Sequence, residues 1–119
     1  MNRLFQISFV LILFATSCVS GSKEMNRNYM WFDCEANYAT LSHPDSIAFY
    51  LKKCQDLGFD NVVVDMKSIM GEVLYDSEIA PYMGDWEGVE RSRDYDMFGY
   101  FLKYGHELGM RVFGSLNVF

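Results

Sequence analysis

The sequence predicts an α/β fold made of about three βα units, which we expect to be the N-terminal part of a (β/α)8 TIM barrel behind a lipoprotein signal peptide. Segments of strand character alternate with segments of helical periodicity, an order that favours parallel strands joined by right-handed crossovers. Each strand also has one face that turns polar at its carboxyl end. This pattern is expected of a barrel whose lumen opens into a pocket at that end.

Residues 1–17 have the order of parts of a lipoprotein signal peptide. Arg3 provides a short positive region, a mainly apolar run follows, and three small residues precede Cys18. The apolar run is too short to span a bilayer, which needs about 20 residues. We expect a lipid on Cys18, residues 18–27 as a polar, flexible tether, and a cell-envelope location. Because residue 20 is Ser20 and not Asp, we expect the outer membrane; the alternative is a plain secretory leader with an incidental cysteine.

Local patterns set the expected order of elements in residues 28–119. That order is a strand over Asn28–Asp33, a helix that starts at Ser42 and is closed by Gly58, a strand over Asn61–Met66, an irregular segment to about residue 95, a helix capped by Asp94 or Asp96 and ended by Gly109, and a strand over Arg111–Asn117. The middle strand contains a β-branched run typical of a buried parallel strand. The helix starts rest on capping residues, and the helix ends rest on glycines that precede a strand.

Alternation within the three strands assigns a covered face and a second face. The face expected against helices carries Met30, Phe32, Val62, Val64, Met66, Val112, Gly114 and Leu116. The second face carries Trp31, Asp33, Val63, Asp65, Lys67, Phe113, Ser115 and Asn117. A complete barrel of this class takes about 250 residues, and the chain has 119. We therefore expect the front end of a longer protein, marginally stable and inactive by itself.

The composition of the chain limits the kinds of ligand and partner that we expect it to bind. The net charge is −6, which argues against nucleic acid, because nucleic-acid binding needs a basic face. Aromatic residues make up 17% of the chain, which fits either a large core or a surface that stacks on flat apolar groups such as sugar rings. No metal-ligand spacing is present, so we expect no metal and no cofactor. Cys34 and Cys54 are expected to be free thiols, since the second lies about 15 Å down a helix, beyond the reach of a disulfide.

Four short motifs resemble the opening of a known group of barrels. They are Trp31-Phe32-Asp33, Val62 to Lys67, Gly71 to Tyr75 with Ser77, Ala80 and Pro81, and Ser115 to Phe119. In these motifs the chain resembles glycoside-hydrolase-like envelope lipoproteins, described as alpha-amylase family or family 10 glycosylhydrolase-like. The resemblance implies a barrel that acts on polysaccharide or oligosaccharide, with its catalytic carboxylates on later strands. The alternative is a non-catalytic, glycan-binding barrel lipoprotein of the cell envelope.

Six residues are expected to contact substrate, and no catalytic residue is assigned. They are Asp33, Asp65, Lys67, Tyr75, Trp86 and Asn117. Parallel strands lie about 4.8 Å apart, so Asp33, Asp65 and Asn117 can converge at neighbouring strand ends. The two aspartates can also reach the separation of about 5 to 9.5 Å that glycosidases use. An Asp65–Lys67 ion pair and a loop anchor at Trp86 are the structural alternatives.

Overall fold

The computed structural model describes residues 28–118, so the predicted leader, Cys18 and the tether lie outside the described residues. Within that range the elements are β1 (Tyr29–Phe32), α2 (Tyr38–Leu41), α3 (Pro44–Asp56), β2 (Asn61–Lys67), β3 (Asp85–Trp86), β4 (Val89–Glu90), α4 (Met97–Glu107) and β5 (Arg111–Leu116). The three long strands and the two long helices confirm the predicted order of elements. The short helix α2 and the β3–β4 hairpin were not predicted.

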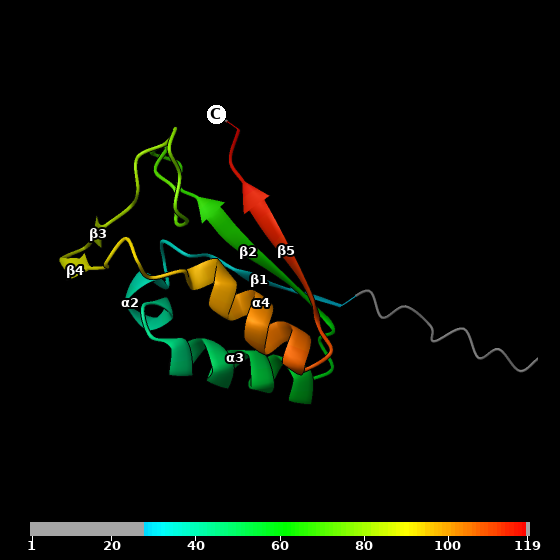
Figure 1. Ribbon diagram of the computed structural model, residues 1–119. Helices are drawn as coiled ribbons and strands as arrows, with labels where there is room; N and C mark the ends of the chain where they lie inside the picture. Colours follow the sequence, from blue (N-terminus) through cyan, green and yellow to red (C-terminus); the bar gives the residue numbers. More distant parts are fainter. Residues whose placement is uncertain (1–27, 119) are drawn as a thin grey trace, which may run out of the picture.

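The prediction of a (β/α)8 TIM barrel is wrong for this structure. The described residues form an open three-stranded sheet in the order β1-β2-β5, and a separate antiparallel pair, β3 and β4. Both pairings within the three-stranded sheet are parallel, with α3 and α4 on one face (Figure 1). The local pattern was misleading because one covered face and polar strand ends also suit an open sheet. Closure depends on pairing between the outer strands, which periodicity does not report.

Both long helices end in the same way before a strand. After α3, the N–H of Gly58 donates to the carbonyl of Gln55 and the N–H of Phe59 to that of Cys54. After α4, Gly109 and Met110 make the equivalent two bonds. This double bond pattern is the Schellman motif, which places its glycine at positive φ. Gly58 and Gly109 have φ of 86° and 70°, so the predicted helix–glycine–strand joint is confirmed twice.

The predicted helix starts have different outcomes. Asp96 caps α4, since its Oδ1 accepts from the N–H of Gly99 at 2.8 Å. The predicted start at Ser42 is wrong, because the N-cap of α3 is His43 and it makes no side-chain capping bond. Ser42 instead ends α2, where its hydroxyl donates to the carbonyl of Tyr38 at 2.7 Å. A serine near a proline signals a helix boundary, but the pattern does not say which helix it belongs to.

The core lies between the sheet and the two long helices. Its centre contains Val62, Val64, Ile47, Leu51, Met97 and Phe101, all fully buried. Phe101 of α4 meets Phe32 of β1 edge to face at 4.9 Å between ring centroids. Gly105 brings α4 close to β5, since a Cβ there would lie 2.6 Å from Cγ2 of Val112. The face assigned to helices from strand alternation is therefore the covered face, except at the carboxyl end of β5, where Gly114 and Leu116 are exposed.

The long segment after β2 is held against α2 by Arg91. This side chain is 6% exposed and donates to the hydroxyl of Ser42 and the carbonyl of Tyr38, both at 3.0 Å. Its guanidinium carbon also lies 3.9 Å from the ring centroid of Tyr38. A buried guanidinium needs such partners, because desolvation of an unpaired charge is costly. These contacts fix the segment that surrounds the carboxyl end of the sheet.

Candidate functional site

The face of the sheet opposite the helices carries exposed aromatic side chains. Tyr29, Trp31 and Phe113 are 52%, 59% and 41% exposed. Trp31, Val63 and Phe113 stand in one register row across the three strands. Large aromatic groups this exposed are uncommon on a single face and mark surfaces that bind partners or ligands. The open face is therefore the candidate binding surface.

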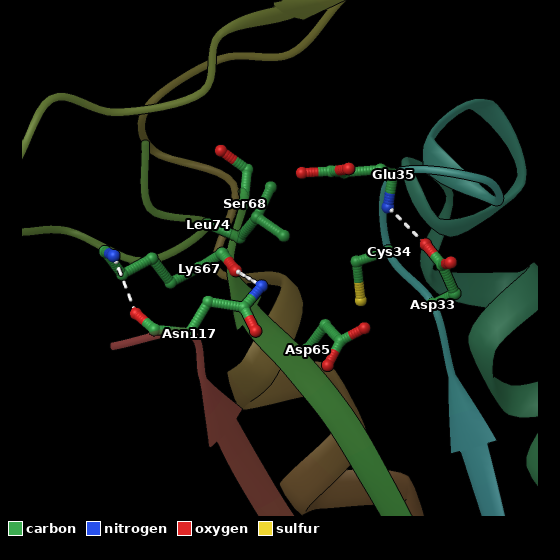
Figure 2. Close-up of a pocket in the computed structure, with 8 residues that line it drawn as sticks. All are labelled: Asp33, Cys34, Glu35, Asp65, Lys67, Ser68, Leu74 and Asn117. Atoms are coloured by element: carbon green, nitrogen blue, oxygen red, sulfur yellow. Dashed lines mark hydrogen bonds between the residues drawn. The ribbon is translucent and has the colours of Figure 1, made fainter. Parts of the chain in front are cut away.

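A small polar pocket lies at the carboxyl end of this sheet, next to the open face. Its volume is about 120 Å³, and it is bounded by the end of β1, the end of β2 and the segment after β5 (Figure 2). The lining residues are Asp33, Cys34, Glu35, Asp65, Lys67, Ser68, Leu74 and Asn117. Four of the six residues predicted to contact substrate thus lie in one pocket, because the parallel strands end at the same edge of the sheet.

Asp33 is committed to the turn that follows β1. Its Oδ1 accepts from the N–H groups of Glu35 and Ala36, at 3.1 and 2.9 Å. Its main-chain carbonyl accepts from the side chain of Asn37 at 2.8 Å. Side-chain bonds of this type stabilise turns and compete with other partners of the carboxylate. Asp33 therefore shapes the pocket wall, and this oxygen is not directed at a ligand.

Asp65 links the pocket to the open face. Its Oδ2 accepts from the indole N–H of Trp31 at 3.0 Å, while the carboxylate itself lines the pocket. A hydrogen bond at the indole nitrogen holds one edge of the ring, which limits the rotamers that Trp31 samples. The exposed ring is thus presented in a fixed direction beside a polar cavity.

Lys67 and Asn117 hold each other across the ends of β2 and β5. The ammonium group of Lys67 donates to the carbonyl of Asn117 at 2.6 Å, and the Asn117 amide donates to the Lys67 carbonyl at 3.0 Å (Figure 2). Within residues 28–118, Lys52 pairs with Asp56 and Arg93 pairs with Asp76, whereas Asp65 and Lys67 do not pair with each other. An ion pair between Asp65 and Lys67, the structural alternative, is therefore not formed there.

Sequence reasoning missed four residues of the pocket: the apolar Leu74 and three residues that directly follow strands. Glu35 spans two loops, because its Oε1 accepts from the N–H of Ile69 at 3.0 Å. The hydroxyl of Ser68 accepts from the N–H groups of Met70 and Glu72 and so fixes the turn after β2. Cys34 is completely buried at the pocket wall. Their positions directly after strands were the only signal, since none of them belongs to a chemical motif.

Cys34 and Cys54 are free thiols, as predicted, and the structure buries both of them. Burial, together with the negative charge of Asp65, raises the pKa of the Cys34 thiol to about 12. The thiol is therefore protonated at neutral pH, and a thiolate is what a cysteine nucleophile requires. Cys34 acts here as a small core residue that lines the pocket and gives no support to nucleophilic catalysis.

Tyr75 and Trp86 lie apart from this pocket. Tyr75 borders a more apolar cavity of about 390 Å³ together with Phe98, Leu102 and Leu116. Trp86 is in β3, is only partly exposed, and packs against the hydrophobic core. This packing favours the loop-anchor role for Trp86, while its predicted contact with sugar stays a prediction.

Two further properties concern the part of the chain that the structure describes. Among residues 28–118, no group of three or more His, Cys, Asp or Glu side chains is placed to hold a metal ion. No helix of this range has the length and apolar character needed to cross a membrane.

Comparison with known proteins gives a weak similarity. No family model matches the chain. An S-layer-related protein of Niallia circulans is 29% identical over 96 residues, which cover 76% of this chain. The chain spans about 6% of the length of that protein. The similarity agrees with the association with the cell envelope that the leader predicts.

Proposed function

We propose that this chain is the glycan-binding part of a cell-envelope protein that recognises polysaccharide or oligosaccharide. One observation carries the proposal: the exposed indole of Trp31 is hydrogen-bonded to Asp65 beside a polar pocket. An aromatic ring that stacks on the apolar face of a sugar, with polar groups at its edge for the hydroxyls, is the combination that sugar binding needs.

The aromatic surface supplies the stacking part of this recognition. Trp31 and Phe113 stand on the same face of the sheet and expose more than two fifths of their surface. Pairs of aromatic side chains contribute about 0.5 to 1.5 kcal/mol beyond their buried area, and we expect a ring stacked on a sugar to contribute on the same order. Because both residues are on strands, their positions are fixed before a ligand arrives, which lowers the entropic cost of binding.

The pocket supplies the hydrogen-bonding part. Asp65 offers carboxylate oxygens, Lys67 an ammonium group and Asn117 an amide, and all three line the same cavity. Sugar hydroxyls donate and accept hydrogen bonds, so they can satisfy both kinds of group. Because Asp33 uses one carboxylate oxygen for the turn after β1, we propose binding in preference to an Asp33–Asp65 catalytic pair. The hydrolase reading rests on the resemblance alone.

We further propose that the mature protein is held at the membrane by a lipid on Cys18, with Ser20 favouring the outer membrane. Support for the lipid comes from the order of residues 1–18, and the similarity to an S-layer-related protein supports only the association with the cell envelope. Metabolic labelling with a palmitate analogue should mark the wild-type chain. Labelling that persists in Cys18→Ala would remove the support for a lipid anchor.

The glycan proposal is tested by affinity for soluble oligosaccharides, measured by calorimetry on the full chain. Trp31→Ala should lower the affinity about tenfold, the equivalent of roughly 1.4 kcal/mol. Phe49→Ala is the matched control, since Phe49 is 60% exposed but lies on α3, away from the open face. Equal losses in both variants, or no loss in Trp31→Ala, would contradict the proposed site.

A further inference from the structure

The geometry points to the orientation and the class of the glycan, and this inference rests on the proposed function. We propose that a neutral, extended glycan chain lies lengthwise along β2, with one chain end in the polar pocket. The ligand class is a flat chain with equatorial linkages, such as a β-1,4-linked glucan. The open face would then contact the last few sugar rings of such a chain.

The aromatic side chains of the open face make two contacts, and both lie over the middle strand, β2. Tyr29 of β1 and Phe113 of β5 are on the two outer strands, yet their ring centroids are only 5.9 Å apart. Their side chains therefore lean over β2 from opposite sides. Trp31 also reaches from β1 toward β2, where its indole N–H meets Asp65. The aromatic surface thus runs along β2.

The length of this surface fits more than one sugar ring. The Phe113 position pairs with Val63, near the middle of β2, and the pocket begins at Asp65 and Lys67. The five residues of β2 from 63 to 67 are separated by four steps and span about 13 Å, at about 3.3 Å per step. That span is longer than a single sugar ring, so an extended chain can contact it with more than one ring. A chain that coils leaves the plane of the sheet within this length and loses the contact with Phe113.

The pocket bounds the ligand at the carboxyl end of β2. Glu35 from the turn after β1 accepts from the N–H of Ile69 in the turn after β2, which joins the two loops beside the cavity. Ser68 and Leu74 complete that wall. A chain that follows β2 therefore meets a wall, and the pocket receives a terminal ring.

The negative charges that line the pocket disfavour the binding of acidic sugars. The pocket is lined by three carboxylates, Asp33, Glu35 and Asp65, and by one ammonium group, that of Lys67. The whole chain carries a net charge of −6. Like charges repel at close range, so glycans that carry uronic acids are disfavoured at this end of the surface. Neutral hydroxyls make hydrogen bonds there without this cost.

Calorimetry on the full chain separates this inference from the proposed function. We expect the affinity for β-1,4-glucose oligomers to rise at least tenfold from one ring to three and then to level off. Maltotriose and tri-galacturonate should bind at least tenfold more weakly than cellotriose. Phe113→Ala should reduce the affinity for cellotriose to that for cellobiose and leave cellobiose unchanged, whereas Phe49→Ala should change neither. If Phe113→Ala loses its folded circular dichroism spectrum, Phe113→Leu is the substitute.

Each other result has a definite meaning. Equal affinity for cellotriose and maltotriose, with loss in Trp31→Ala, would overturn the extended-chain inference and leave the proposed function standing. Affinity that still rises beyond four rings would overturn the bounded end of the site. Binding to none of the oligosaccharides would overturn both.

Discussion

The two faces of the three-stranded sheet are built from alternate residues of the same strands, yet they have opposite character. On the helix side, Val62 and Val64 are 0% exposed. On the other side, Trp31 and Phe113 are 59% and 41% exposed and lead to the polar pocket. The difference shows that one strand sequence can carry stability on one face and a candidate binding surface on the other.

The largest expected loss of stability comes from a substitution in the covered face. Phe101 is fully buried and stacks edge to face on Phe32, so Phe101→Ala should cost about 3 to 5 kcal/mol of unfolding free energy. A small domain has little more than that in total, and we expect a largely unfolded protein. Trp31→Ala on the open face should change the urea midpoint little. Similar losses in the two variants would contradict the division between the faces.

A smaller effect is expected where α4 approaches β5. Alanine in a helix interior normally gains about 1 kcal/mol over glycine. At Gly105, however, the new Cβ would lie 2.6 Å from Cγ2 of Val112. Overpacking of this kind costs about 1 to 3 kcal/mol, so Gly105→Ala should lower stability in urea denaturation. The double variant Gly105→Ala with Val112→Ala should relieve the clash; a stabilising single variant would show that the helix shifts freely.

Alkaline pH should destabilise the fold through two groups, the Cys34 thiol and the Tyr95 hydroxyl. Burial raises the pKa of Cys34 from 9.0, and that of Tyr95 from 10.0, to about 12 in each case. Folding thus favours the protonated forms, so their contribution is complete below pH 9 and is lost as the pH rises through about 12. Urea midpoints should fall above pH 9. The double variant Cys34→Ala with Tyr95→Phe should show a flatter decline, and an unchanged slope would contradict this assignment.

The sequence predicted local features of the fold better than its closure. Strand alternation identified the covered face, and the glycines at 58 and 109 identified both helix ends, because these patterns depend on neighbouring residues. The barrel was wrong because closure depends on contacts between distant strands. Ser42 was wrongly assigned to the start of α3 for a similar reason. Its hydroxyl accepts from Arg91, which is 49 residues away in the chain and gives no signal in the local sequence.

The candidate site was predicted in the same uneven way. Asp33, Asp65, Lys67 and Asn117 were found because parallel strands end at one edge of the sheet. The contribution of Glu35 depends on its bond to Ile69, which lies on another loop. The hydrogen bond between Trp31 and Asp65, which joins the open face to the pocket, is a contact 34 residues apart and had no signal in local spacing.

The central claim, that the open face binds glycan through Trp31, is tested most directly by tryptophan fluorescence. The chain has two tryptophans, so Trp86→Phe leaves Trp31 as the sole reporter, and Trp31→Phe leaves Trp86. We expect cellotriose to shift the emission of Trp31 to shorter wavelength in a saturable way and to leave that of Trp86 unchanged. A response of Trp86 alone, or of neither tryptophan, would contradict the claim.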